Sequence, residues 1–296
     1  VLPGPGLNIQ RSPLCGRDFE YFSEDPILAG RMAAAYVRGI QKNGISACPK
    51  HFAVNSQELR RMASDSVLDE RTLRELYLTG FEIVVKEAKP KTIMTSYNLI
   101  NGTYANENAH LLQDILRKDW GFDGAVVTDW GGSNDHALGV KNGSTLEMPC
   151  PGGDSIRELM KAVQDGKISE ADVDARLDEM LELVLSTHAA VEKAPRTFDA
   201  AAHHKLARRA AAESIVLLKN EGGILPLKPN EKLAVIGDFA ETPRYQGAGS
   251  SAVNALQVDT LLDSIKADDS GITLVGYASG FERQGAADAE KLEEAG

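Results

Sequence analysis

An aspartate and a tryptophan stand side by side directly after a short apolar run. Residues 125–128 are bounded by glycine and suit a strand buried on both faces of a parallel sheet. Asp129 and Trp130 follow at its carboxyl end, the edge where α/β proteins bind ligands. There the carboxylate could act as a nucleophile or a base, and the indole could form an apolar platform for a sugar. The alternative is that Asp129 only caps the next helix, and spacing alone leaves both interpretations open.

A second polar group follows the strand that the sequence predicts at residues 45–49. Lys50 and His51 lie at the carboxyl end of that strand, and Arg61 follows later in the same loop. These side chains offer several hydrogen-bond donors to the hydroxyl groups of a ligand. An isolated Lys50 could instead form a Schiff base with a carbonyl substrate. The alternative for the whole group is a solvated basic loop.

Two further parts of the sequence carry residues that suit a binding site. Residues 11–25 are dense in charged and aromatic side chains, although packing and capping would account for most of them. Met94 and Tyr97 lie near the end of another predicted strand, where a tyrosine could orient a nucleophile or only pack at the rim. Glu147 lies at the end of a fourth predicted strand and competes with Asp129 as a catalytic carboxylate.

Composition and charge exclude some classes of protein. The 296 residues carry 32 Lys and Arg against 43 Asp and Glu, a net charge of −11, which argues against a nucleic-acid binder. Hydrophobic residues make up 43% and charged residues 25%, as in a soluble globular protein. No apolar run approaches the roughly 18–20 residues of a membrane span. We therefore expect no nucleic-acid and no membrane partner. The sequence does not fix the compartment and slightly favours the cytoplasm.

The cysteines and histidines do not form a metal-binding pattern. Cys15, Cys48 and Cys150 show no metal-ligand spacing and make a disulfide framework unexpected. His203 and His204 begin a predicted helix with no third ligand type nearby. We expect no metal and no cofactor.

Strand-like runs alternate with longer helical runs, which predicts an α/β fold with a parallel sheet. Before residue 190 about five strands are predicted, near residues 7–10, 45–49, 92–97, 125–128 and 145–148. A closed (β/α)8 barrel has eight strands, so the sheet is either open and doubly wound or part of a barrel. Residues 191–200 read as a linker between residues 1–190 and a second α/β unit at 201–296. That unit opens with a helix predicted at 201–219.

Together the motifs resemble glycoside hydrolase family 3, the β-glucosidase group. The matching pieces occur in family order and are residues 4–9, 13–26, 50–52, 94–98, 126–131, 146–149, 214–220 and 225–227. The resemblance implies an α/β fold in which a partial (β/α)8 TIM-type barrel is followed by a partial α/β sandwich domain.

The resemblance also implies roles for individual residues. Asp129 matches the catalytic nucleophile of the family, with Tyr97 close to it. The residues that match sugar-binding positions are Arg17, Lys50, His51, Arg61, Met94, Tyr97, Trp130 and, in the second unit, Ser250 or Ser251.

Two residues of the family pattern fall outside the sequence. An Asp that binds a sugar hydroxyl would lie before Val1, and the acid/base Glu would lie beyond Gly296. We therefore expect an internal piece of a longer enzyme that is not a competent glycosidase by itself. The N-acetylglucosaminidase branch of the family continues its Lys-His loop with Pro-Gly-His-Gly. Here residues 53–56 are Ala-Val-Asn-Ser, which disfavours that branch.

The implied function is that of a retaining exo-acting β-glucosidase, which removes terminal non-reducing β-D-glucosyl residues through a covalent glycosyl-enzyme. The expected partner is a β-glucoside or oligosaccharide substrate, and association into homo-oligomers is left open. Three alternatives stay open: a β-xylosidase or other exo-glycosidase of the same family, a non-catalytic sugar-binding fragment, and a Schiff-base aldolase that uses Lys50.

Overall fold

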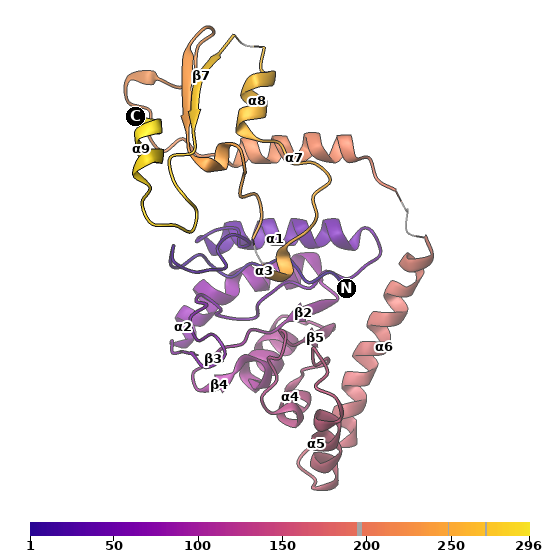
Figure 1. Ribbon diagram of the computed structural model, residues 1–296. Coiled ribbons are helices and arrows are strands. Elements are labelled where there is room, and N and C mark those ends of the chain that lie inside the picture. Colours follow the sequence, from indigo (N-terminus) through magenta and orange to yellow (C-terminus); the bar gives the residue numbers. More distant parts are fainter. Residues whose placement is uncertain (194–196, 248, 270) are drawn as a thin grey trace. The chain divides into compact units, whose positions relative to one another are not determined.

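The computed structural model describes residues 1–193, 197–247, 249–269 and 271–296. The chain forms two compact units, Val1–Arg196 and Thr197–Gly296 (Figure 1). Among the described residues, no helix is long and apolar enough to cross a membrane, and no group of three His, Cys, Asp or Glu side chains is placed to hold a metal ion.

The first unit alternates helices with short strands. Its elements are α1 (Pro26–Gln41), β1 (Asp65–Ser66), α2 (Glu70–Thr72), η1 (Leu73–Leu78), α3 (Thr79–Ala88), β2 (Thr92–Met94), β3 (Leu99–Ile100), β4 (Thr103–Tyr104), η2 (Ala105–Glu107), η3 (His110–Asp119), β5 (Ala125–Val127), α4 (His136–Asn142), α5 (Gly153–Gln164) and α6 (Glu170–Lys193). Asp25 begins α1 and Asp69 begins α2, because each carboxylate accepts hydrogen bonds from N–H groups of the first turn.

Five extended segments of the first unit run parallel, and each lies beside the next one along the chain. β2 and β5 form a regular pair. Single parallel bridges join the other neighbours, which are Leu2 with Ala47, Gly6 with Lys50, Phe52 with Thr95, and Val127 with Leu146. Parallel segments with helices between them end at one common edge, so the residues that follow them gather there.

Several predicted strands are shorter than expected. The strand predicted at residues 7–10 is not formed. The N–H group of Leu7 bonds to the carbonyl of Lys50 in the neighbouring segment, but that of Gln10 bonds to the carbonyl of Ser23. The strands predicted at residues 45–49 and 145–148 are reduced to single bridges. Residues 45–49 end at Pro49 and residues 145–148 are followed by Pro149, and a proline lacks the N–H group that a longer ladder needs.

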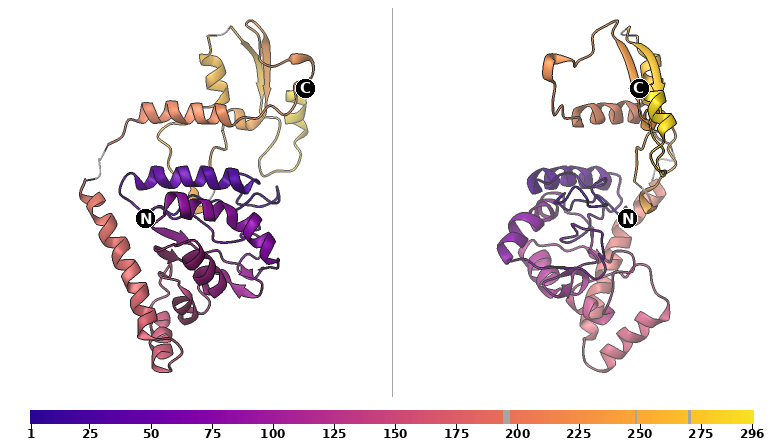
Figure 2. Two further views of the ribbon diagram at one scale, coloured as in Figure 1. Left: turned by 180° about the vertical axis from the view of Figure 1, so that it is seen from behind. Right: turned by 60° about the vertical axis from the view of Figure 1, so that its left-hand side comes forward.

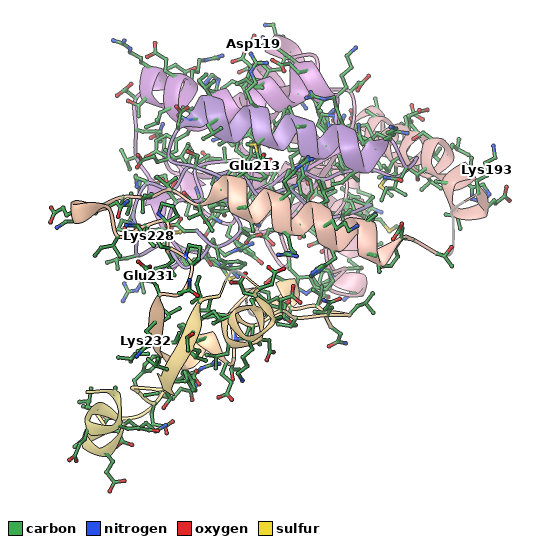
Figure 3. The ribbon with its side chains drawn as sticks, turned by 90° about the horizontal axis from the view of Figure 1, so that it is seen from above. Asp119, Lys193, Glu213, Lys228, Glu231 and Lys232 are labelled. Atoms are coloured by element: carbon green, nitrogen blue, oxygen red, sulfur yellow. The ribbon has the colours of Figure 1, made fainter. Side chains whose placement is uncertain are left out.

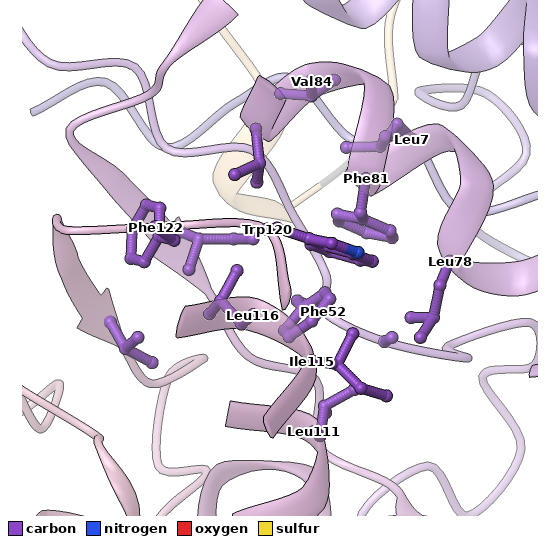
Figure 4. Close-up of a cluster of buried hydrophobic side chains, with 14 of the residues drawn as sticks. Leu7, Phe52, Leu78, Phe81, Val84, Leu111, Ile115, Leu116, Trp120 and Phe122 are labelled. Carbon is purple, nitrogen blue, oxygen red and sulfur yellow. The ribbon is translucent and has the colours of Figure 1, made fainter. Parts of the chain in front are cut away.

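The main apolar core of the first unit lies between the parallel segments and their helices (Figure 4). Phe52 packs edge-on against Phe81 and Trp120, with ring centroids 5.2 and 5.8 Å apart. α1 and α3 lie side by side (Figures 1 and 2). They approach closely at Gly30, where an added Cβ would stand 3.0 Å from the Cα of Gly80. This core anchors the chain directly after the predicted sugar-binding pair.

The second unit is built around one parallel strand pair. Its elements are α7 (Ala200–Ser214), η4 (Glu221–Gly223), β6 (Lys232–Ile236), η5 (Asp238–Ala240), η6 (Gly249–Ser251), α8 (Leu261–Ala267), β7 (Thr273–Ala278) and α9 (Ala289–Ala295). β6 and β7 pair in parallel with an irregularity between Leu233 and Ala234. Val235, Ala240 and Leu262 form the buried centre of this unit.

Two helix ends differ from the prediction. The helix predicted at residues 201–219 ends at Ser214, because Ile215 is extended with φ −75° and ψ 125°. Meanwhile α6 runs to Lys193, into the segment 191–200 that is predicted as a linker; residues 194–196 of that segment lie outside the described residues.

A tight turn leads into β6. The N–H group of Lys228 donates to the Glu231 carboxylate at 3.0 Å, and the N–H group of Glu231 donates to the Lys228 carbonyl at 3.2 Å. Figure 3 labels both residues together with Lys232, the first residue of β6. These reciprocal bonds close the turn and fix where the strand begins.

Candidate active site

Asp129 lies two residues past the end of β5, with its carboxylate largely buried. Its Oδ1 atom accepts a hydrogen bond from the N–H group of Trp130 at 2.7 Å. Its Oδ2 atom is buried and has no hydrogen-bond partner among the described residues. The helix that follows, α4, is capped by Asp135, whose carboxylate accepts from Leu138 N–H at 2.8 Å. The capping interpretation of Asp129 is therefore wrong.

His51 is a titratable neighbour of that oxygen. Its Nε2 atom lies 3.4 Å from Asp129 Oδ2 and 3.2 Å from an Arg17 guanidinium nitrogen, while Nδ1 lies 3.1 Å from the hydroxyl of Tyr21. Burial, and then the charges of Arg17, Lys50 and others nearby, holds the pKa of His51 well below its ordinary value. His51 is therefore neutral at ordinary pH and forms no ion pair with Asp129.

Arg17 and Lys50 share one carboxylate. Glu20 pairs with Arg17 three residues away, and its other oxygen lies 3.2 Å from Lys50 Nζ. All of these side chains are mostly buried. The shared pairing fixes two cationic donors beside His51, an arrangement that suits hydroxyl recognition better than a free amine that forms a Schiff base.

Tyr97 connects the loop after Asp129 to Arg61. Its hydroxyl donates to the carbonyl of Trp130 at 2.7 Å, and the Arg61 guanidinium lies 4.5 Å from the centre of its ring. Arg61 is also paired with Glu58 at 2.7 Å. Burial, followed by the charge of Asp129, raises the pKa of Tyr97 to about 12. Tyr97 is therefore a neutral hydrogen-bond donor. The neighbouring Trp130 is 63% exposed, so its indole is accessible to a ligand.

The side chains of Met94 and Glu147 lie in different surroundings. Met94 packs with Cys48 and Val127 in a small buried cluster under the site. Leu146 and Met148, which flank Glu147 in the chain, pack against the same cluster. The Glu147 carboxylate lies instead 3.5 Å from Nδ1 of His136 on α4. Glu147 therefore does not join the group around Asp129.

The structure thus brings Arg17, Lys50, His51 and Asp129 together, and joins Arg61, Tyr97 and Trp130 to the loop that follows Asp129. Ser250 lies on η6 in the second unit, and its contact with a sugar stays a prediction. Sequence reasoning missed Asn8, Glu20 and Tyr21 as partners in this site. For Glu20, the three-residue spacing from Arg17 was an available signal.

Comparison with known families decides what kind of protein this is. The model of the glycosyl hydrolase family 3 N-terminal domain matches residues 4–183, and that of the family 3 C-terminal domain matches residues 215–294. The chain belongs to glycosyl hydrolase family 3.

Two of its relatives are named as glycosidases. The thermostable β-glucosidase B of Acetivibrio thermocellus is 47% identical over 284 residues, and the exo-α-(1→6)-L-arabinopyranosidase of Bifidobacterium longum is 46% identical over 290. Each match covers 95% of this chain, and the chain spans 37% and 38% of the length of these two relatives.

Solved structures of the family agree with the fold. A β-glucosidase from Bifidobacterium adolescentis, 43% identical, gives a TM-score of 0.91 over 99% of this chain and 43% of its own. β-Glucosidase 3B from Thermotoga neapolitana, 38% identical, gives 0.86 over 99% of this chain and 40% of its own. The α/β fold is therefore that of family 3: part of a (β/α)8 TIM-type barrel, followed by part of an α/β sandwich.

Proposed function

We propose that the protein is a retaining exo-β-glucosidase in which Asp129 is the nucleophile. The observation that supports this most is the Asp129 carboxylate itself. One of its oxygens is held by the next backbone N–H group. The other is buried, has no hydrogen-bond partner among the described residues and lies 3.4 Å from His51 Nε2. A carboxylate kept in this way is poised to attack an electrophilic carbon.

The reaction takes two displacement steps. Asp129 Oδ2 forms a bond to the anomeric carbon while the bond to the leaving oxygen breaks, and that oxygen takes a proton from a second carboxyl group. A water molecule then loses its proton to the same group and releases the sugar with its original configuration. Glu20 and Glu58 do not suit the role of this acid, because each is paired with Arg or Lys side chains.

The binding roles follow from charge and shape. Arg17 and Lys50 carry fixed positive charge and several donors, which suit the hydroxyl groups of a terminal sugar. The exposed indole of Trp130 offers an apolar face on which the ring of a sugar can stack. Both features favour a carbohydrate over an apolar ligand. Ser250 of the second unit is proposed as a further sugar contact from the family resemblance.

A second candidate substrate follows from one relative. The B. longum arabinopyranosidase is as similar to this chain as the β-glucosidases are, at 46% identity. A β-xylosidase or arabinosidase specificity is therefore the alternative, since pentopyranosides lack the hydroxymethyl group of glucose. Comparing kcat/KM for the nitrophenyl β-glucoside, β-xyloside and α-L-arabinopyranoside separates these substrates.

The stereochemistry of the first product tests the mechanism. The proposal predicts that proton NMR of a β-glucoside reaction shows β-glucose before mutarotation, and that cello-oligosaccharides lose one glucose at a time. α-Glucose as the first product would contradict the retaining mechanism. Release of larger oligosaccharides would contradict exo action. Binding of glucose in calorimetry without any turnover by the full-length protein would favour a non-catalytic sugar-binding protein.

A further inference from the structure

A buried carboxylate outside the site, that of Glu107, holds the far end of the loop after Asp129. Its Oε1 atom accepts hydrogen bonds from the N–H groups of Asn134 at 2.9 Å and Asp135 at 2.7 Å. The residue is only 6% exposed, so water competes little for these bonds. Hydrogen bonds from neutral donors to a charged acceptor are stronger than those between neutral groups.

The loop of residues 129–135 is thereby held at both ends. Near its start, the carbonyl of Trp130 accepts from the hydroxyl of Tyr97 at 2.7 Å. At its end, Glu107 holds the last two N–H groups before α4. Between these anchors the N–H group of Gly131 donates to the carbonyl of Met148 at 2.7 Å, and that of Gly132 donates to the carbonyl of Asp129 at 2.9 Å. The loop that carries Asp129 and Trp130 is therefore bonded along its length, and its conformation depends on all of these contacts.

Glu107 is itself fixed from several sides. Its own carbonyl accepts from the side-chain amide of Asn142, at the end of α4, at 2.7 Å. The preceding residue, Asn106, contacts the hydroxyl of Thr95 at 3.2 Å. An added Cβ at Gly139 of α4 would stand 3.1 Å from the Asn106 amide nitrogen, so η2 and α4 are packed closely. The carboxylate therefore has little freedom to follow a moving loop.

We propose that Glu107 is a positioning residue for Asp129, which sets the conformation of the loop that presents the nucleophile and Trp130. This role rests on the proposed function, because Glu107 contacts no reacting atom and acts only through the loop. Burial raises the pKa of Glu107, and the N–H groups of Asp135 and Asn134 oppose that rise. A carboxylate that stays buried against such a cost is consistent with a role that depends on its backbone contacts.

Three substitutions separate this role from general stability. Glu107→Gln keeps an oxygen that can accept both N–H groups, Glu107→Asp is one methylene too short to reach both, and Glu107→Ala has no acceptor. The reaction of the full-length protein with a dinitrophenyl 2-fluoro-glucoside isolates the first displacement. At saturating reagent, Asp129 in the Ala and Asp variants should be labelled at least about tenfold more slowly than in the wild type, because small misplacements of reacting groups have large effects on rate. The reagent concentration that gives half of the maximal labelling rate should stay within about twofold of the wild-type value. The Gln variant should label within about twofold of the wild-type rate.

Asp25 provides a matched control. Its Oδ1 atom also accepts from two consecutive N–H groups, those of Ile27 at 2.7 Å and Leu28 at 3.1 Å, at the exposed start of α1. Asp25→Ala should lower the free energy of unfolding by about 1 kcal/mol, the usual effect of losing a helix cap, and leave the labelling rate unchanged.

The outcomes are distinct. Wild-type labelling rates in Glu107→Ala or Glu107→Asp overturn the positioning role while the proposed function stands. An equal loss of rate in Asp25→Ala, or no rescue in Glu107→Gln, shows a merely structural effect and also overturns it. If Glu107→Ala does not fold, the comparison of the Asp and Gln variants decides. Absence of label on Asp129 in the wild-type protein overturns the proposed function, and the positioning role with it.

Discussion

The side-chain amide of Asn8 forms two hydrogen bonds with the backbone of His51. Its Nδ2 atom donates to the His51 carbonyl at 2.9 Å, and its Oδ1 atom accepts from the His51 N–H group at 2.8 Å. Both residues are buried. Because the His51 ring lies 3.4 Å from Asp129, this pairing fixes the imidazole beside the proposed nucleophile.

Replacing Asn8 by alanine should therefore affect both stability and activity. Two buried backbone groups of His51 would lose their partners, which should lower the free energy of unfolding by about 2 kcal/mol or more. We also expect kcat/KM to fall about tenfold as the ring of His51 shifts. Chemical denaturation and steady-state kinetics on an aryl β-glucoside measure the two effects.

Asn220 offers the matched control for Asn8. It makes the same pair of bonds with the backbone of Leu225, at 2.7 and 3.0 Å, on an exposed part of the second unit. Asn220→Ala should have a smaller effect on stability and none on kcat/KM, because water replaces the lost partners. A kcat/KM for Asn8→Ala within about twofold of wild type would contradict the account.

Tyr97→Phe removes the hydroxyl that bonds to the Trp130 carbonyl. A neutral hydrogen bond contributes about 0.5–1.5 kcal/mol, so kcat/KM should fall about two- to tenfold. Tyr104→Phe is the control, because its hydroxyl also donates to a backbone carbonyl, that of Met62 at 3.3 Å, on an exposed part of the unit. Equal kinetics for the two variants would show that the Tyr97 bond does not serve the site.

Buried His51 should make the protein less stable in acid. Its pKa is held well below the ordinary value, whereas the unfolded chain takes up a proton near about pH 6.5. Below that pH the unfolded state binds more protons, so the free energy of unfolding falls. His51→Gln should show a smaller loss of stability between about pH 7 and 5 than wild type. His188→Gln, whose parent side chain is 68% exposed, should keep the wild-type profile, and equal slopes in all three proteins would contradict the prediction.

Gly124 precedes β5 and should tolerate no side chain. An added Cβ would overlap the carbonyl of Lys91 and stand 2.8 Å from the ring of Phe122. Gly124→Ala should therefore lower the free energy of unfolding by about 1–3 kcal/mol. Gly39 is the control, since it lies in α1 with open space around it and Gly39→Ala should raise stability by about 0.5–1 kcal/mol. Denaturation curves that rank the two variants in the opposite order would refute this packing argument.

The sequence predicts which residues lie at the strand ends better than it predicts the residues that form hydrogen bonds with them. His51 and Asp129 come together because parallel segments end at one edge, which the alternation of strands and helices implies. Arg17, which lies 3.2 Å from His51, is predicted by the family resemblance alone. Asn8 could not be predicted, since it lies 43 residues from His51 and an asparagine has no spacing signal for such a bond. The hydrogen bonds of Glu107 could not be predicted either, because its partners are backbone N–H groups of a loop that is distant in sequence.

The same limit applies to the fold. Two helices of the first unit begin at capping carboxylates, those of Asp25 and Asp69, and a cap of this kind is visible in a sequence. The apolar run at residues 215–218 suits a helix and an extended segment equally, so the predicted helix continued past Ser214, where the chain becomes extended. Ladder length depends on which N–H groups find partners, and apolar patterning alone does not reveal this.

The central claim is that Asp129 is the nucleophile, and covalent labelling tests it most directly. The full-length protein would be treated with a dinitrophenyl 2-fluoro-glucoside, digested and mapped by mass spectrometry. The account predicts release of dinitrophenolate in proportion to enzyme, the fluoro-sugar attached to Asp129, and no label in Asp129→Asn. Label on another carboxylate, such as Glu147, or undiminished labelling of Asp129→Asn, would contradict it.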